Sequence, residues 1–401
     1  MIPASSLEVL KTAVIFGADA VYIGGEVFGL RAKAKNFSHD DMKEGIAFAH
    51  EHGVRVHVTV NILAHNRDLE GVREYLKELK ELGPDALIIA DPAIFEMAKE
   101  ICPEIERHVS TQANNTNYGT YQFWWKQGAK RVVSARELSL AEIKEIRANI
   151  PEEMEIESFI HGAMCISYSG RCLLSNYFTG RDANQGACTH PCRWKYAVVE
   201  ETRPGEYMPV YENERGTYIF NSKDLCMIEH IPELIDAGID SFKIEGRMKT
   251  ALYVATVART YRKAIDDYLE DPELYRKNMP WYLDQISNCT YRQFTTGFYF
   301  GRPDDEAQIY DSNTYVREYT YLGIIGGERD GMYRIEQRNK FSVGETIELM
   351  KPNGDNIEVT VKKIVDEDGN EQESAPHPKQ VLYIDLGGHA DQYDILRRKE
   401  D

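Results

Sequence analysis

Short apolar runs alternate with longer amphipathic segments over roughly the first 250 residues of the chain. One amphipathic segment is Leu69–Leu82, in which Val72, Leu76 and Leu79 fall on one helix face. The predicted strands are Ala20–Ile23, Arg55–Val60, Ala86–Ala90, Arg107–Thr111, Arg131–Ala135, Glu155–Ile160, Tyr218–Asn221 and Ser241–Ile244. Strands that alternate with helices form βαβ units and a parallel sheet. About eight such units over this length favour a closed (β/α)8 TIM-like barrel over an open sheet.

The pattern changes in the last third of the chain. A long helix is predicted over Thr250–Leu269, and an aromatic, polar stretch follows to about Asp311. From Tyr319 onward, short alternating runs and Gly-rich turns indicate antiparallel hairpins. These strands are Tyr321–Ile325, Met332–Glu336, Thr346–Met350, Ile357–Val365 and Val381–Leu386. The expected fold class is therefore α/β, with the barrel over residues 1–311 and a small C-terminal antiparallel β-barrel or sandwich domain over residues 319–401.

One segment interrupts the barrel pattern. Between about Ser167 and Gly216 the chain is rich in Cys, Gly, Arg and Asn and has no helical period, which indicates an insertion over about residues 162–216. A long irregular segment in a compact domain is usually functional. On a barrel, an insertion that follows a strand lies on the active-site face.

Four of the seven cysteines lie in this insertion, at Cys165, Cys172, Cys188 and Cys192. The chain shows no secretion signal, so such a cluster indicates a metal or catalytic site rather than a disulfide framework. Four thiolates suit an iron–sulfur cluster or tetrahedral zinc. The wide spacing of the first two cysteines favours the cluster, and metal-free buried thiols are the third possibility.

The other three cysteines are interpreted separately. Cys226 is predicted at a helix start, as a small core residue that is held in reserve as a ligand in place of Cys192. Cys102 and Cys289 are isolated in the sequence and are predicted to be structural.

The net charge of −18 argues against a protein that coats nucleic acid nonspecifically, although it leaves room for a local basic patch. No run approaches the roughly 20 apolar residues of a membrane span. The first residues lack the basic flank and apolar run of a signal peptide. We therefore expect a cytoplasmic protein with no membrane partner.

Charged residues occur near the ends of two predicted barrel strands. Residues two apart on a strand share a face, which groups Glu157 with His161, and Lys243 with Glu245 and Arg247. Such charges are costly to bury unless they are paired or functional. They could form a structural ion pair between Lys243 and Glu157 or Glu245, bind an anionic small molecule, or orient a base.

Further polar residues are predicted at the rim of the barrel, namely Asn61, Gln112, Arg136 and Asn221. Within the insertion, basic residues are interleaved with aromatic ones. They are Arg171, Arg181, Arg193 and Lys195, with Tyr168, Tyr177, Phe178, Trp194 and Tyr196. This mixture suits phosphate contacts and base stacking. A solvated loop with core aromatics would produce the same pattern.

Two common hydrolase motifs are absent from the sequence. It contains neither a Gly-x-Ser-x-Gly elbow nor a His-Glu-x-x-His helix. Ser222 and Lys223 are adjacent, and adjacent residues of a strand point to opposite faces. A thiol nucleophile near His161 or His190 is conceivable, but a metal cluster would occupy those thiolates.

The cysteine segment closely resembles the signature of peptidase family U32, the collagenase-like proteases. The matching motifs are Glu157-Ser-Phe-Ile-His161-Gly-Ala-Met-Cys165-Ile-Ser-Tyr-Ser-Gly170-Arg-Cys172, Asn184-Gln-Gly-Ala-Cys188-Thr-His-Pro-Cys192-Arg-Trp194, Asn221-Ser-Lys-Asp-Leu225 and Lys243-Ile-Glu-Gly-Arg247. The resemblance covers nearly the whole chain and is closest to the branch of tRNA 5-hydroxyuridine modification proteins.

The resemblance implies a barrel and two competing activities. One is Fe–S-dependent hydroxylation of RNA without molecular oxygen, forming 5-hydroxyuridine at the tRNA wobble position with prephenate as co-substrate. The other is hydrolysis of peptide bonds. The first implies tRNA as partner and leaves open a paralogous subunit or an electron donor.

The resemblance also implies roles for individual residues. Cys165, Cys172, Cys188 and Cys192 would bind a [4Fe–4S] cluster. The co-substrate is a dicarboxylate, so the substrate-binding group would be Arg136, Arg171, Lys243, Glu245 and Arg247, because arginine pairs bidentately with carboxylates. Glu157 or His161 would handle the proton. One departure from the family is that the chain begins almost at Pro3-Ala4, so we expect its first strand to be shortened or missing, as in a truncated reading frame.

Overall fold

The structure is a computed structural model. It describes residues 1–26, 28, 36–165, 167–185, 187–194, 198–199, 207–208, 212–213, 216–217, 223–246, 248–289, 293–301, 319–388 and 390–400. The chain forms two compact units. One comprises Met1–Val14, Asp19–Lys249 and Arg292–Tyr315, and the other comprises Ile15–Ala18, Thr250–Tyr291 and Val316–Asp401.

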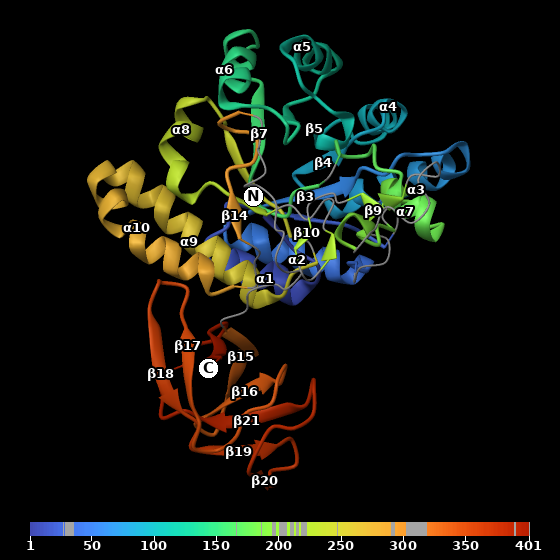
Figure 1. The fold of residues 1–401 in the computed structure, drawn as a ribbon. Helices are drawn as coiled ribbons and strands as arrows, with labels where there is room; N and C mark the ends of the chain where they lie inside the picture. The colour runs from blue at the N-terminus through green and yellow to red at the C-terminus, as the bar shows by residue number, and fades with distance from the viewer. Residues whose placement is uncertain are drawn as a thin grey trace. The chain divides into compact units, whose positions relative to one another are not determined.

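The first unit contains a closed ring of parallel strands (Figure 1). In ring order, its described strands are β1 (Ile2–Pro3), β2 (Ala20–Ile23), β3 (Arg55–Val60), β4 (Ala86–Ile89), β5 (Glu106–Val109), β6 (Arg131–Val133), β7 (Glu155–Gly162) and β13 (Ser241–Ile244). Each pairs in parallel with the next. The ring closes where Met1 N donates to Phe242 O and Ile244 N donates to Met1 O, both at 3.0 Å. The predicted TIM-like barrel is confirmed.

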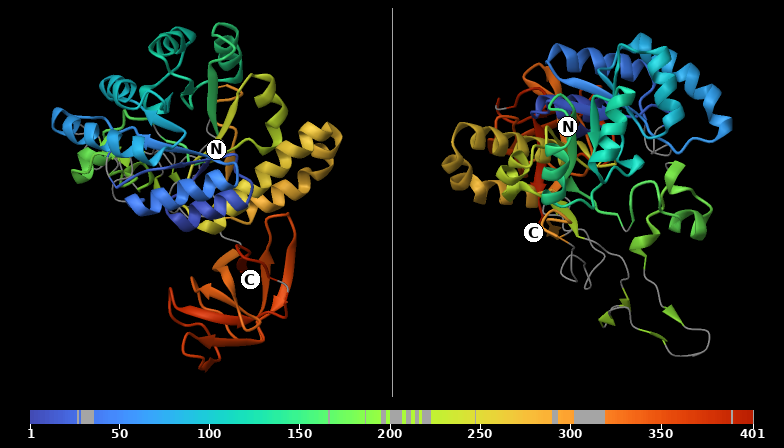
Figure 2. Two further views of the ribbon diagram at one scale, coloured as in Figure 1. Left: turned by 180° about the vertical axis from the view of Figure 1, so that it is seen from behind. Right: turned by 90° about the horizontal axis from the view of Figure 1, so that it is seen from above.

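Helices surround this ring (Figures 1 and 2). They are α1 (Leu7–Ile15), α2 (His39–Glu51), α3 (Leu69–Leu82), α4 (Pro92–Ile101), α5 (Tyr118–Gln127), α6 (Leu140–Ala148) and α8 (Ile231–Asp236). Helix α3 buries Val72, Leu76 and Leu79, the face that its sequence predicts, and ends at Gly83 in the left-handed conformation. In β3, every residue from Val56 to Val60 is buried, as expected for a parallel strand covered on both sides.

The first strand is present but short. Although β1 has only two residues, Ile2 pairs with Val21 and Pro3 with Tyr22 of β2. The strand predicted at Tyr218–Asn221 lies outside the described residues. Beside it in sequence, β12 (Asp224–Cys226) pairs antiparallel with the end of β7 and parallel with β14 (Phe294–Thr295). Cys226 therefore ends a strand, and its predicted position at a helix start is wrong.

Inside the insertion the structure describes α7 (Leu174–Thr179) and the two-residue strands β8 (Val198–Val199), β9 (Tyr207–Met208), β10 (Glu212–Asn213) and β11 (Gly216–Thr217). β8 pairs with β9, and β10 pairs with β11, both antiparallel. In its described residues the insertion thus contains one short α-helix, two 3-10 helices at Ala183–Gln185 and Pro191–Arg193, and two short antiparallel strand pairs.

The second unit combines two helices with an antiparallel sheet. Helix α9 (Ala251–Glu270) confirms the helix predicted over Thr250–Leu269, whereas α10 (Pro272–Ser287) lies in the aromatic, polar stretch for which no helix was predicted. Its internal Pro280 and its aromatic and polar residues obscure the helical period in the sequence.

The sheet of this unit has eight described strands in the order β18-β17-β22-β15-β16-β21-β19-β20 and is curled (Figure 1). They are β15 (Tyr319–Arg329), β16 (Met332–Glu336), β17 (Thr346–Met350), β18 (Asn356–Thr360), β19 (Lys363–Asp366), β20 (Glu371–Gln372), β21 (Val381–Asp385) and β22 (Ile395–Lys399). The strand predicted at Ile357–Val365 is wrong as one element, because the chain turns at Val361 and Lys362 between β18 and β19. Leu322, Phe341, Leu349, Leu382 and Leu396 belong to the core of the sheet.

Candidate functional site

The cysteine segment begins where β7 ends, on the side of the barrel where the strands have their carboxyl ends. Gly162, the last residue of β7, has a φ of 112°. A Cβ atom at this position would lie 2.7 Å from the carbonyl oxygen of Glu245. The close approach therefore requires glycine here, and it directs the chain out of the sheet into the cysteine segment.

Hydrogen bonds tie the segment to the loops that follow β3 and β5. Asn114 Nδ2 donates to Ser169 O at 2.8 Å, and Arg171 Nε donates to Asn114 Oδ1 at 2.6 Å. Leu63 N donates to Asn184 O at 3.3 Å. The sequence reasoning did not find Asn114, whose only signal is a polar residue just after a predicted strand. The segment lies across the carboxyl ends of the strands, the usual active-site face of such a barrel.

Arg136, in the loop after β6, makes the most direct contact with the cysteines. Its Nη1 donates to Ala163 O at 2.8 Å, and its Nη2 lies 3.3 Å from Cys165 Sγ and 3.2 Å from Ser169 Oγ. The guanidinium also lies 5.1 Å from the ring centre of Phe159. Arg136 thus holds a positive charge against one predicted ligand sulfur.

Each of the four predicted ligands is a cysteine outside any disulfide bond. Cys165 and Cys188 are exposed, while Cys172 and Cys192 are half-buried. His190 N donates to Cys188 Sγ at 3.4 Å. Among the described residues, no three His, Cys, Asp or Glu side chains are grouped closely enough to hold a metal ion. The donor set itself fits a thiolate-ligated metal, because four thiols lie on one segment and two of the sulfurs receive N–H donors of the kind that stabilise cluster sulfur.

Glu157 and Lys243 form a buried ion pair inside the barrel. Lys243 Nζ lies 2.7 Å from Glu157 Oε1, and Arg131 Nη1 lies 2.8 Å from Glu157 Oε2. Ser241 Oγ donates to Glu157 Oε2 at 2.8 Å. Burial raises the pKa of Glu157, but the two cations outweigh it and hold this pKa well below its usual range. The low pKa and the paired charges favour a structural ion pair. They argue against a Glu157 that transfers protons and against a Lys243 that binds an anion.

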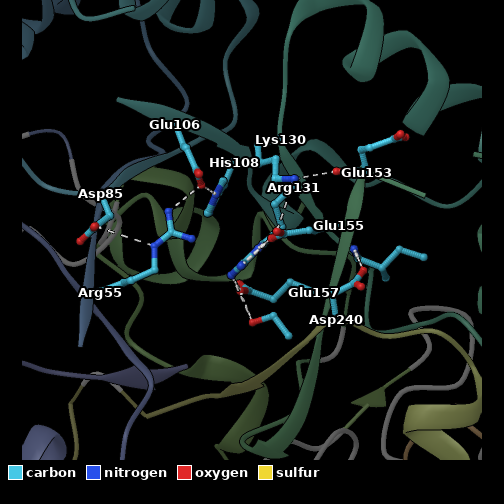
Figure 3. A network of polar contacts seen from close by, with 12 residues as sticks. Arg55, Asp85, Glu106, His108, Lys130, Arg131, Glu153, Glu155, Glu157 and Asp240 are labelled. Carbon is cyan, nitrogen blue, oxygen red and sulfur yellow. Dashed lines mark hydrogen bonds and ion pairs between the residues drawn. The ribbon is translucent and has the colours of Figure 1, made fainter. Parts of the chain in front are cut away.

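The ion pair continues into a polar network at the opposite ends of the strands (Figure 3). Arg131 also pairs with Glu155 at 2.6 Å. Arg55 pairs with Glu106 at 2.8 Å, and Glu106 Oε2 lies 3.0 Å from His108 Nε2. Arg55, Glu106, Arg131 and Glu155 are the first residues of β3, β5, β6 and β7. In such barrels this amino-terminal face serves stability rather than catalysis.

His161 lies near the carboxyl end of β7, on the same side as the cysteines. It is buried, and its backbone oxygen accepts from Glu245 N at 2.8 Å. Burial, with a contribution from the charge of Lys249, lowers the pKa of His161 to about 3, so the imidazole is neutral at neutral pH. His161 and Glu157 come from one strand, but their surroundings differ. Glu157 is a paired carboxylate, whereas His161 is a neutral imidazole.

The remaining predicted residues occupy varied positions. Glu245 is half-buried just after β13, and Asn61 Nδ2 donates to Ser110 Oγ at 3.2 Å at the end of β3. Arg247, Asn221, Lys195 and Tyr196 lie outside the described residues, as does the side chain of Arg193. In the described part of the chain, no helix is long and apolar enough to cross a membrane.

Comparison with known proteins gives consistent matches over both units. The model of peptidase family U32 matches residues 5–309, and that of the peptidase family U32 C-terminal domain matches residues 317–397. The tRNA hydroxylation protein P1 of Bacillus subtilis (strain 168) is 43% identical over 386 residues, which cover 96% of this chain and 90% of that protein. The tRNA hydroxylation protein P of Escherichia coli (strain K12) is 40% identical, over 95% of this chain and 92% of that protein. The 23S rRNA 5-hydroxycytidine C2501 synthase of the same organism is 38% identical over 67% of this chain and 39% of that protein.

Proposed function

Because the chain belongs to peptidase family U32 and resembles proteins named for tRNA hydroxylation over nearly its whole length, we propose that it is an enzyme that hydroxylates RNA. The observation that carries this proposal is the 43% identity over 96% of the chain, which includes the complete cysteine segment. A relative named for 5-hydroxycytidine synthesis in rRNA supports a pyrimidine base as the target.

The finer proposal is formation of 5-hydroxyuridine at the wobble position of tRNA, without molecular oxygen and with prephenate as co-substrate. The reaction replaces the hydrogen on C5 of the base by a hydroxyl group, which oxidises the base by two electrons, so a co-reactant must take up two electrons, either as the oxygen donor or as an electron acceptor. A protein that carries out this chemistry needs a redox group and a site that excludes competing reactions.

Cys165, Cys172, Cys188 and Cys192 are the proposed ligands of a [4Fe–4S] cluster, with Cys226 in reserve for Cys192. When bound, such a cluster supplies electron transfer at a potential set by its charge, its hydrogen bonds and its exposure. Arg136 holds the loop at Cys165 through Ala163 O and Ser169 Oγ, and His190 N donates to Cys188 Sγ. The Arg136 contacts keep Cys165 on the carboxyl face of the barrel, whereas the His190 contact is local to the turn that carries Cys188.

Proton handling and co-substrate binding are assigned on the same geometry. His161 is the better candidate of the predicted pair for handling the proton, because Glu157 is held ionised by Lys243 and Arg131 inside the barrel. For a dicarboxylate co-substrate, Arg136 and Arg171 are the predicted cations that the structure describes on the cysteine side.

Two measurements test the proposal. Protein purified without oxygen is expected to contain about four irons and four acid-labile sulfides per chain, with fewer in a Cys165→Ala variant. In an E. coli strain that lacks its own tRNA hydroxylation protein P, expression of this chain is expected to raise the amount of uridine with one additional oxygen in digested tRNA. Expression of the Cys165→Ala variant is expected to leave this amount unchanged. Iron-loaded protein that leaves the tRNA nucleosides unchanged would contradict the assigned reaction.

Peptide hydrolysis remains the second candidate because of the name of the matching family. It predicts cleavage of a collagen-like peptide by protein from which iron has been removed. Cleavage that disappears when one nucleophile is replaced, together with unchanged tRNA, would favour the peptidase.

A further inference from the structure

Three aromatic side chains of the cysteine segment form an exposed group, here called the aromatic patch: Tyr177, Phe178 and Trp194. Their exposed fractions are 83%, 46% and 42%. The ring centres of Tyr177 and Phe178 are 5.1 Å apart, and those of Phe178 and Trp194 are 6.2 Å apart. Exposed aromatic groups of this kind on a protein surface mark a site of interaction.

The local structure holds these rings outward. Ser175, fully buried on α7, accepts from Thr189 N at 3.1 Å and lies 3.0 Å from Thr189 Oγ1. One turn later, Thr179 Oγ1 donates to Ser175 O at 2.7 Å and lies 3.4 Å from the same Thr189 hydroxyl. Since Ser175 and Thr179 share the inner face of α7, Tyr177 between them points away from the segment.

The segment that carries the aromatic patch has a net charge opposite in sign to that of the whole chain. Between Ala163 and Trp194 the sequence has three arginines, Arg171, Arg181 and Arg193, and one carboxylate, Asp182. The complete chain has 65 acidic and 47 basic residues. Arg171 and Arg181 are exposed. A net positive segment in an acidic chain favours a polyanionic partner at this segment.

We propose that the aromatic patch stacks unpaired bases of a single-stranded RNA loop, while Arg181 contacts its phosphates. Stacking on aromatic rings suits unpaired bases, whose faces are open, whereas the bases of a helix are already stacked. The patch belongs to the segment that carries the four cysteines, so an RNA loop bound there lies beside the proposed reaction centre. The inference rests on the proposed function, and it adds the protein surface that binds the RNA loop.

The test measures binding of a fluorescent RNA hairpin, whose loop has about seven nucleotides, to the iron-loaded protein without oxygen. Replacing Tyr177 by Ala is expected to weaken hairpin binding roughly 5- to 100-fold, and Tyr177→Phe to change it by no more than about twofold. A fully paired RNA duplex should bind both variants as it binds the original protein. Arg181→Gln should lower the slope of log affinity against log salt by about one.

A matched control is Phe123→Ala, which removes a ring that is 51% exposed on helix α5, and hairpin binding is expected to stay unchanged. Equal iron content in all variants shows that the cysteine segment is intact. Hairpin affinity unchanged in Tyr177→Ala, or reduced equally in Tyr177→Phe, would overturn the inference. So would a loss of self-association or of a protein partner in Tyr177→Ala with RNA affinity preserved.

The two proposals can fail separately. If Tyr177→Ala loses hairpin binding while the tRNA nucleosides do not depend on the protein, the RNA surface stands and the hydroxylation proposal fails. If the nucleosides depend on the protein but Tyr177→Ala binds and acts normally, the hydroxylation proposal stands and the surface is wrong.

Discussion

Arg136 Nη2 lies 3.3 Å from Cys165 Sγ, and this contact joins a barrel loop directly to the cysteine segment. If Cys165 binds the proposed cluster, the guanidinium offsets negative charge on that sulfur. Replacing Arg136 by Gln is then expected to speed iron loss to a chelator roughly tenfold, because outer contacts of metal ligands commonly change metal affinity by this order.

Iron release from anaerobic protein, followed by absorbance, measures this effect. The rate of iron release from Arg136→Lys should fall between those of the original protein and Arg136→Gln. Lysine keeps the charge but loses the two-pronged guanidinium that reaches Ala163 O and Ser169 Oγ. Arg276→Gln, at an exposed arginine of α10, is the control. Equal iron release from Arg136→Gln and the original protein would show that the contact does not support the metal.

Glu157 offers a test that separates a structural role from a catalytic one. Glu157→Gln leaves Lys243 and Arg131 buried without their shared carboxylate, so the free energy of unfolding should fall by about 3–5 kcal/mol. Urea denaturation measures the loss. Glu74→Gln, which breaks an exposed pair with Lys77, should cost no more than about 1 kcal/mol. Unchanged stability with lost RNA hydroxylation would restore the catalytic role.

His57 predicts a dependence of stability on pH. Burial, with the charge of His108 as the next cause, holds the pKa of His57 in the folded protein well below 6.5, the value for the unfolded chain. As the pH falls below 6.5, the unfolded chain binds a proton that the folded protein does not, so the free energy of unfolding decreases. This group contributes at most about 1.4 kcal/mol per pH unit.

The variant His57→Phe should therefore show a shallower loss of stability between pH 6.5 and pH 5, measured by urea denaturation. Within the described structure, neither ring nitrogen of His57 has a hydrogen-bond partner, so Phe removes two buried polar atoms without breaking a bond. We expect no loss of stability at pH 7. An unchanged pH dependence would show that another group dominates the acid response.

Gly162 tests how the cysteine segment leaves the barrel. Gly162→Ala places a Cβ atom 2.7 Å from the carbonyl oxygen of Glu245 and strains a backbone with a φ of 112°, so it should cost about 2–4 kcal/mol and lower iron content. Gly83→Ala is the matched control, because its φ is also positive, at 65°, but nothing lies within 4 Å of the added atom. Its cost should be about 1 kcal/mol, with iron content unchanged. Equal effects of the two substitutions would refute the steric argument.

The barrel could be predicted closely from the sequence because its signal is local. The predicted bounds of β2, β3, β13 and α3 agree with the structure. Buried parallel strands are continuous apolar runs, and α3 has a regular apolar face. Helix α10 was missed because Pro280 and its mixed composition hide that period. The division between β18 and β19 was missed because Val361 lies between them and continues the apolar pattern.

The candidate site could be predicted only in part. The cysteine motif places four thiols on one segment, but spacing alone cannot show that Arg136 reaches Cys165 or that Asn114 anchors Arg171. For Glu157, the pairing with Lys243 was among the alternatives predicted from the sequence. Its second partner, Arg131, was not predicted and lies 26 residues earlier in the sequence. Such partners are set by the register between strands, which a single sequence does not encode locally.

The cysteine segment is hydrogen-bonded to loops at the carboxyl ends of several barrel strands. Leu63, Asn114 and Arg136 follow three different strands, and each is hydrogen-bonded to the segment or to its first residues. The cysteine segment thus connects three loops that come from different strands. If the four cysteines bind the proposed cluster, the cysteine segment would become more rigid, and so would the three loops bonded to it. The cluster would then stabilise the substrate-binding surface in addition to its redox role.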